Sequence, residues 1–238
     1  GRGLVLSNGE FGDRLKDHAR RAGLDFAVLD VEWGRPFARR DIETALGQGD
    51  IDWLWAVHCE TSTGVLNDLS VLREICAERG ARLAMDCISS VGTMPVDLAG
   101  VSLATCVSGK GLGAYPGLSM VFYDQDLSSA PGTLPRYLDL ALYAAADGVP
   151  FTISTNLLYA LEAAVRNLKP VEVFERIDAA AAHLRRELRG MGCPTVAEDR
   201  HSTPAVTTIE MPPGASSADL GRRLEDMGFW LSYNSEYL

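Results

Sequence analysis

Short apolar runs alternate with amphipathic stretches over the first two-thirds of the chain. Apolar residues spaced three or four apart predict helices at Phe11–Ala22, Asp41–Leu46 and Leu69–Glu78. The apolar runs predict strands at Leu4–Ser7, Phe26–Val31, Trp53–Val57, Leu83–Met85, Leu103–Val107 and Ser119–Tyr123. Strands that are apolar along their whole length and alternate with helices are typical of an α/β fold. We therefore expect a mostly parallel sheet with helices on both faces.

The pattern changes near residue 170. Two long helices are predicted at Asn156–Leu168 and Glu172–Leu188, separated by Pro170. The tail then predicts a strand, a helix and a strand, at Ala205–Ile209, Ala218–Met227 and Phe229–Tyr233. We therefore expect a large domain over residues 1–170 and the start of a small α+β C-terminal domain over residues 171–238.

Composition narrows the classes of partner. The 238 residues are 47% hydrophobic, which is enough for a sizeable core. The formal net charge of −10 argues against nucleic acid, which attracts a surplus of Lys and Arg. No apolar run is long enough to predict a membrane span. The five cysteines form no C-x-x-C pair, which favours reduced thiols in the cytoplasm and no metal site.

Polar and charged residues follow four of the predicted strands. In a parallel sheet, ligands bind beyond the carboxyl ends of the strands, so these residues should share one crevice. Asp86 follows the fourth strand, and Lys110 follows the fifth within Ser108-Gly109-Lys110-Gly111. Pyridoxal phosphate requires this pair of groups, because its aldehyde bonds to a lysine and its ring nitrogen needs a carboxylate.

Four motifs around these positions resemble one known family. They are NGEFGDRL (8–15), HCETSTGVLNDL (58–69), MDCISSVGTMPVDL (85–98) and SGKGLGAYPGLSMVF (108–122). Their sequence and order are similar to the class V aminotransferases of the fold-type I pyridoxal-phosphate enzymes. Within that family the chain resembles the alanine–glyoxylate/serine–pyruvate aminotransferases and the 2-aminoethylphosphonate–pyruvate transaminases. The resemblance covers nearly all of the chain.

The resemblance implies a role for seven residues of this sequence. Lys110 matches the lysine that holds the cofactor as a Schiff base, and Asp86 matches the carboxylate at the pyridine nitrogen. The remaining matches are to cofactor-binding residues. Phe11 and Ile88 match the residues on the two ring faces, Thr61 the hydroxyl near the 3-oxygen, Ser108 a phosphate contact, and Thr152 a threonine that reaches the neighbouring subunit's phosphate. The last match implies a homodimer with shared active sites.

The implied activity is transfer of an amino group between a small amino acid or amine and a 2-oxo acid. Two alternatives remain open at this stage: an elimination of the C–S lyase or desulfurase type on the same cofactor, and a degenerate non-catalytic domain. We also expect the chain to be part of a longer enzyme rather than a naturally shortened domain. The family's phosphate loop should then precede Gly1, and its substrate-binding arginine should follow Leu238.

Overall fold

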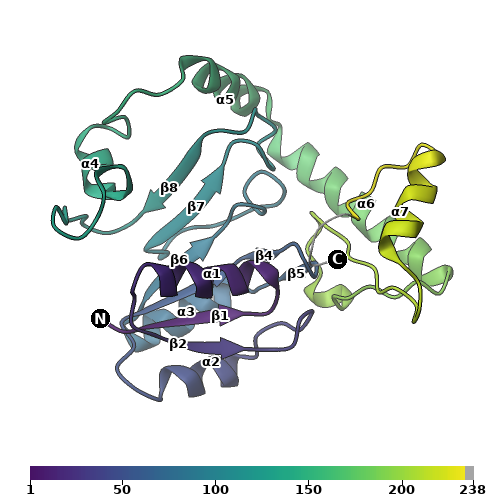
Figure 1. Cartoon of the computed structure of the whole chain (residues 1–238), viewed down its shortest axis with the longest axis horizontal. Helices are drawn as coiled ribbons and strands as arrows, with labels where there is room; N and C mark the ends of the chain where they lie inside the picture. The colour runs from purple at the N-terminus through teal and green to yellow at the C-terminus, as the bar shows by residue number, and fades with distance from the viewer. Residues whose placement is uncertain (234–238) are drawn as a thin grey trace.

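The computed structural model describes residues 1–233 and shows a sheet of six strands (Figure 1). The strand order is β2-β1-β3-β6-β7-β8. All neighbouring strands are parallel except β7 and β8, which are antiparallel. The strands are β1 (Gly3–Ser7), β2 (Phe26–Asp30), β3 (Trp53–Val57), β6 (Arg82–Asp86), β7 (Leu103–Val107) and β8 (Ser119–Tyr123). Each coincides with a predicted strand to within a residue or two, and the predicted fold class is confirmed.

Helices cover both faces of this sheet. On one face, α1 (Glu10–Arg21) packs Leu15 and Ala19 against Val5 and Val57. On the other face lies the larger core, to which α2 (Arg39–Leu46) and α3 (Leu69–Arg79) contribute their buried residues. Side chains alternate between faces along a strand, so β1, β2 and β3 contribute residues to both cores. This explains why these strands are apolar along most of their length.

A two-stranded hairpin follows the end of β3. It pairs β4 (Cys59–Glu60) with β5 (Val65–Leu66), and the sequence pattern did not reveal it because each strand has only two residues. Ser202 and Thr203, from the C-terminal part of the chain, attach to this hairpin. Ser202 forms a bridge with Val65, and the Thr203 amide donates to the Gly64 carbonyl at 2.8 Å. The hairpin therefore joins the tail of the chain to the sheet.

The second part of the chain is mainly helical. It contains the short α4 (Leu140–Ala145), the long α5 (Thr155–Asn167) and α6 (Pro170–Gly190), and then α7 (Ser217–Asp226). Pro170 is the first residue of α6, where its missing N–H costs nothing. The domain boundary that we propose at residue 170 coincides with this helix start. Among the described residues, no helix is both long and apolar enough to cross a membrane.

The two strands predicted in the tail are wrong. Within 205–209, only Ile209 forms a bridge, with Thr195. The run 229–233 has no strand structure, and Phe229 and Trp230 are largely exposed. A strand needs a neighbour with which to exchange hydrogen bonds, and among residues 1–233 these runs have at most one bridged partner. The helix predicted between them is confirmed as α7.

Candidate functional site

The carboxyl end of β6 brings Asp86 to the α1 face of the sheet. Asp86 is paired with Val57 of β3 and Thr105 of β7, so the three side chains point to the same side. Val57 packs against α1, which identifies that side. His18 of α1 and Lys110 both act electrostatically on the Asp86 carboxylate. The structure therefore brings Asp86 and Lys110, predicted from the motifs, to one edge of the sheet.

Burial raises the pKa of Asp86 above its usual range. A hydrogen bond from the Ile88 amide to Oδ1, 2.9 Å long, and the charge of Lys110 oppose this effect without cancelling it. A half-buried carboxylate that is short of partners gains stability from a cationic group placed beside it. These surroundings of the Asp86 carboxylate fit a protonated pyridine nitrogen, which offers such a group.

A tight loop after β7 presents Lys110. Ser108 is fully buried, and its hydroxyl donates to the Tyr115 carbonyl at 2.7 Å while accepting from the Leu118 amide at 3.2 Å. A side chain at Gly109 would lie 2.6 Å from the Pro116 ring. Lys110 itself is exposed. Hydrogen bonds and close packing within the loop thus hold it together, and its Lys110 side chain is left exposed.

The Lys110 loop also packs against the turn that follows Asp86. A Cβ atom at Gly111 would lie 2.4 Å from the Val91 carbonyl oxygen, and one at Gly92 would lie 2.4 Å from the Gly111 carbonyl carbon. Gly92 also has a φ of +88°, which favours glycine. The two turns can approach this closely only because both residues lack side chains. This contact fixes Lys110 relative to the turn that bears Ile88.

Phe11 and Thr61 come from neighbouring elements on the same side of the sheet. Phe11 is the second residue of α1 and packs on the edge of the α1-side core, with the Arg14 guanidinium 4.9 Å from its ring centroid. Thr61 is half-buried, whereas the adjacent hydroxyls of Ser62 and Thr63 are buried and bonded to Glu60. Of these three hydroxyls, Thr61 is therefore the one best placed for a ligand.

Ser108 and Thr152, the two residues expected to contact phosphate, differ in their surroundings. The Ser108 hydroxyl donates to the Tyr115 carbonyl and so braces the loop that carries Lys110, and its expected phosphate contact stays a prediction. Thr152 lies exposed in the segment between α4 and α5, beside Phe151, whose ring stacks on Tyr137. The phosphate contact expected of Thr152 is with a second copy of the chain and stays a prediction.

The cysteines near the site are buried, free thiols. Burial raises the pKa of Cys59 to about 11 and that of Cys87 to about 12. Both thiols are therefore protonated at neutral pH, and a protonated thiol is a poor nucleophile. Within the described part of the chain, no cluster of His, Cys, Asp or Glu could hold a metal ion.

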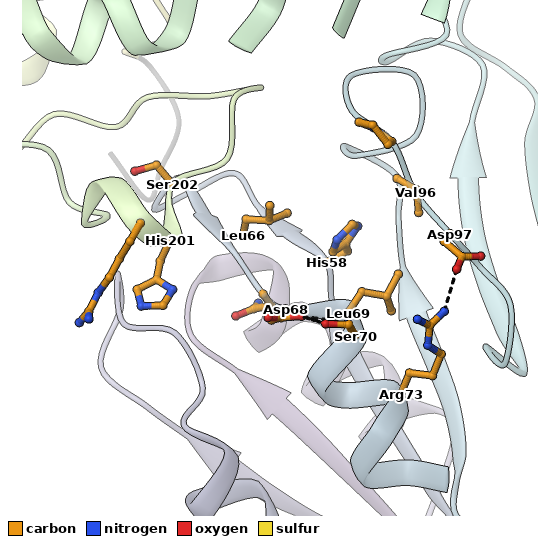
Figure 2. A pocket seen from close by; sticks show the side chains of 13 residues that line it. His58, Leu66, Asp68, Leu69, Ser70, Arg73, Val96, Asp97, His201 and Ser202 are labelled. Carbon is orange, nitrogen blue, oxygen red and sulfur yellow. Dashed lines mark hydrogen bonds and ion pairs between the residues drawn. The ribbon is translucent and has the colours of Figure 1, made fainter. Parts of the chain in front are cut away.

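His58 lies at the end of β3 on the opposite side of the sheet. It lines a cavity of about 400 Å³ together with α3 residues, the 95–97 turn and residues 200–202 (Figure 2). The ring is buried, with Nδ1 in a 2.9 Å hydrogen bond to Ser90 Oγ. Burial lowers the pKa of His58 to about 4, although the charge of Asp68 acts the other way. His58 is thus a neutral brace for the turn that follows Asp86, a role that the sequence did not reveal.

This neutral histidine should make the protein sensitive to acid. The unfolded chain binds the proton with the ordinary pKa of 6.5, whereas the folded chain binds it at about 4. Stability is therefore lost as the pH falls from about 6.5 and levels off below about 4, with a total effect of about 3 kcal/mol. Urea unfolding at pH 7 and pH 5 should show a loss of about 2 kcal/mol from this group.

The matched variants are His58→Gln, which keeps a hydrogen-bonding side chain, and His183→Gln, which changes an exposed histidine. His58→Gln should reduce the pH 7 to pH 5 difference in the free energy of unfolding, and His183→Gln should leave it as in the wild type. An unchanged difference in His58→Gln would show that His58 is not the group responsible.

Comparisons with known proteins add to this geometry. A family model described as aminotransferase class-V matches residues 14–231. The soluble hydrogenase 42 kDa subunit of Anabaena cylindrica is 32% identical over 88% of this chain and 58% of that protein. A 2-aminoethylphosphonate–pyruvate transaminase of Aeromonas hydrophila is 29% identical over 95% of this chain and 64% of that protein.

A solved structure shows the same arrangement of the chain. The crystal structure of alanine–glyoxylate aminotransferase from Nostoc sp. superposes with a TM-score of 0.85 at 31% sequence identity, over 95% of this chain and 64% of that one. This chain therefore spans about six-tenths of the length of these three proteins.

Proposed function

Because the chain belongs to the class-V aminotransferase family, we propose that it binds pyridoxal 5′-phosphate and forms the cofactor-binding part of an aminotransferase. The whole protein would move an amino group between a small amino acid or amine and a 2-oxo acid. The observation that supports this most directly is the pair Asp86 and Lys110, a carboxylate short of partners and an exposed amine at one edge of the sheet.

Each proposed residue has a distinct task. When bound, pyridoxal phosphate supplies an electron sink for the bonds at the donor's α-carbon. Asp86 would keep the ring nitrogen protonated, and Lys110 would hold the cofactor's aldehyde carbon and then move a proton to and from the α-carbon. Phe11 and Ile88 would hold the ring plane, and Thr61 would lie near the 3-oxygen. Thr152 would reach the phosphate bound by a second copy of the chain.

The reaction is tested with purified full-length protein supplied with pyridoxal phosphate. Formation of a 2-oxo acid from an amino donor should continue only while a 2-oxo acid acceptor is present. Sustained turnover of cysteine without an acceptor would instead indicate elimination. A protein that fails to retain the cofactor on gel filtration would contradict both activities and indicate a non-catalytic domain.

We also propose that two copies of the chain associate through the segment around Thr152. This segment exposes several large apolar side chains: Leu134, Tyr137, Leu138, Val149 and Tyr159. Exposed apolar groups in one region favour a protein interface.

The free thiols fit a protein of the reducing cytoplasm, which we propose as its location.

Replacing Leu138 with glutamate should weaken this association. The side chain is 66% exposed in the single chain, so the change should cost little folding stability. Placing a charge within an apolar contact should raise the dimer dissociation constant by about 30-fold or more. Light scattering after gel filtration measures the mass. Leu184→Glu, on an exposed position of α6, should leave the mass unchanged, and a Leu138→Glu dimer of wild-type affinity would place the interface elsewhere.

A further inference from the structure

The first turn of α1 is capped by residues far away in the sequence. Gly9 occupies the N-cap position and has no side chain with which to accept hydrogen bonds. The Gly12 amide instead donates to Glu60 Oε2 at 3.0 Å, and the Glu10 amide donates to Ser62 Oγ at 3.0 Å. The Phe11 amide adds a backbone hydrogen bond to the Glu60 carboxylate. The free amides at the start of the helix are thus satisfied by the hairpin that follows β3.

Glu60 is itself held in place. Its side chain is fully buried, and Oε1 accepts from the Ser62 hydroxyl at 2.6 Å and from the Ser62 amide at 3.2 Å. A buried carboxylate is costly unless its oxygens are hydrogen-bonded, and here both oxygens are. The partial positive charge at the start of α1 further favours a negative group at this position.

The two glycines of the NGEFG motif allow this close approach. A Cβ atom at Gly9 would lie 2.4 Å from Glu60 Cγ, and a Cβ atom at Gly12 would lie 2.6 Å from the Ser7 Cα. Real side chains cannot be accommodated at such distances. Gly9 therefore lets the start of α1 lie directly on the hairpin, and Gly12 lets it lie against the end of β1, with Phe11 between the two glycines.

Glu60 also lies behind the candidate site. The thiol of Cys59, the residue next to it, is influenced electrostatically by Glu60, Lys110 and Asp86 together. We call the hydrogen bonds of Glu60 and Ser62 to the 10–12 amides the clamp on α1. This clamp and the Asp86–Lys110 edge are therefore neighbours. Any movement of the first turn of α1 would displace Phe11 relative to that edge.

We propose that Glu60, assisted by Ser62, is a positioning residue that fixes the Phe11 ring against the bound cofactor. The proposal rests on the function proposed above, because it assumes that Phe11 contacts pyridoxal phosphate. Glu60 acts through the backbone of α1 and need not touch the cofactor. For this role, Glu60 must be a carboxylate that accepts from several amides, and the first turn of α1 must move as one unit.

The test compares Glu60→Gln with a matched control at a second capped helix. Asp68 caps α3 as its own N-cap residue, accepting from the Ser70 amide, the Ser70 hydroxyl and the Val71 amide. Asp68→Ala therefore removes a helix cap away from the Asp86–Lys110 edge. Two readouts are made on full-length protein: hydrogen exchange of the 10–12 amides without cofactor, and the dissociation constant and visible circular dichroism of bound pyridoxal phosphate.

Glu60→Gln should speed exchange of the 10–12 amides at least about 10-fold, raise the dissociation constant about 10-fold and reduce the cofactor's dichroism. Asp68→Ala should speed exchange only at the start of α3 and leave cofactor binding within about twofold of the wild type. If Glu60→Gln does not fold, Ser62→Ala removes one link of the clamp and should give the same changes in smaller measure.

Faster exchange in Glu60→Gln with unchanged affinity and dichroism would overturn the proposal, because Glu60 would then be only a helix cap. Unchanged hydrogen exchange of the 10–12 amides in Glu60→Gln would also overturn the proposal, because Glu60 would then not hold the start of α1. Failure of the wild-type protein to bind pyridoxal phosphate would overturn the proposed function instead, and the exchange measurement, which needs no cofactor, separates these cases.

Discussion

Replacing Lys110 with alanine should lower the turnover number of the protein, assayed with pyridoxal phosphate and a 2-oxo acid acceptor, by at least about 10³-fold. The substitution removes both the amine that would bond to the cofactor and the base that would move the proton. It should not disturb the fold, because Lys110 is exposed and its loop is held by Ser108 and by tightly packed glycines. The visible absorbance that depends on the lysine–cofactor bond should also disappear.

The sequence offers a close control for this variant. Lys169 is exposed and pairs with Glu172 at 3.3 Å, just before α6. Lys169→Ala should retain the absorbance and keep turnover within about twofold, since an exposed ion pair contributes little. Both variants should unfold at the wild-type temperature. A Lys110→Ala protein that keeps its colour and its turnover would remove Lys110 from the site.

Most of the sheet could be predicted from the sequence because its inner strands, such as β1 and β3, are covered on both faces. A run such as Trp53–Val57 has no solvent-facing polar alternation, and together with the helices on either side it specifies a parallel α/β sheet. The predicted helix ends were also close to the observed ones, since residues such as Asp68 and Pro170 mark where a helix begins. Apolar runs and residues at helix ends were therefore enough to predict the elements whose positions depend on nearby sequence.

The failures have a common physical cause. The runs 205–209 and 229–233 have the composition of strands, but strand formation depends on a partner that composition does not reveal. The β4–β5 hairpin was missed for the opposite reason, because it is too short to give a periodic signal. Both errors concern pairing between segments, which depends on the tertiary structure.

In the candidate site, too, residues carried by local motifs could be predicted, whereas contacts between distant segments could not. The motifs predicted Asp86 and Lys110, and the structure places them at one edge of the sheet. They did not predict that Glu60 would cap a helix that starts some fifty residues earlier, with the Gly12 bond spanning 48 positions. A carboxylate inside a buried Cys-Glu-Thr-Ser segment was the one available signal, because such a group must find donors. Only the three-dimensional structure identifies those donors as the amides of α1.

Replacing Asp86 with asparagine should change activity and stability in opposite directions. Asparagine keeps an oxygen to accept from the Ile88 amide, which now bonds to Asp86 Oδ1. It cannot hold a pyridine nitrogen in the protonated state, so turnover should fall by about 10²-fold or more. The cofactor-free protein, in contrast, should become slightly more stable at pH 7, because burial raises the pKa of Asp86 and so disfavours its charged form.

The stability difference between Asp86→Asn and the wild type should depend on pH. With a folded-state pKa above the ordinary 3.8, the Asp86 charge destabilises the cofactor-free protein at neutral pH. That cost disappears as the pH falls through the raised pKa towards 3.8, so the stability advantage of Asp86→Asn should disappear over the same range.

Asp97, an exposed carboxylate paired with Arg73, has a lowered pKa, and Asp97→Asn should give no such advantage. Urea unfolding without cofactor measures both variants. An Asp86→Asn protein that is destabilised at pH 7 would show that the carboxylate serves the fold, whereas a more stable but inactive protein would show that it serves the reaction.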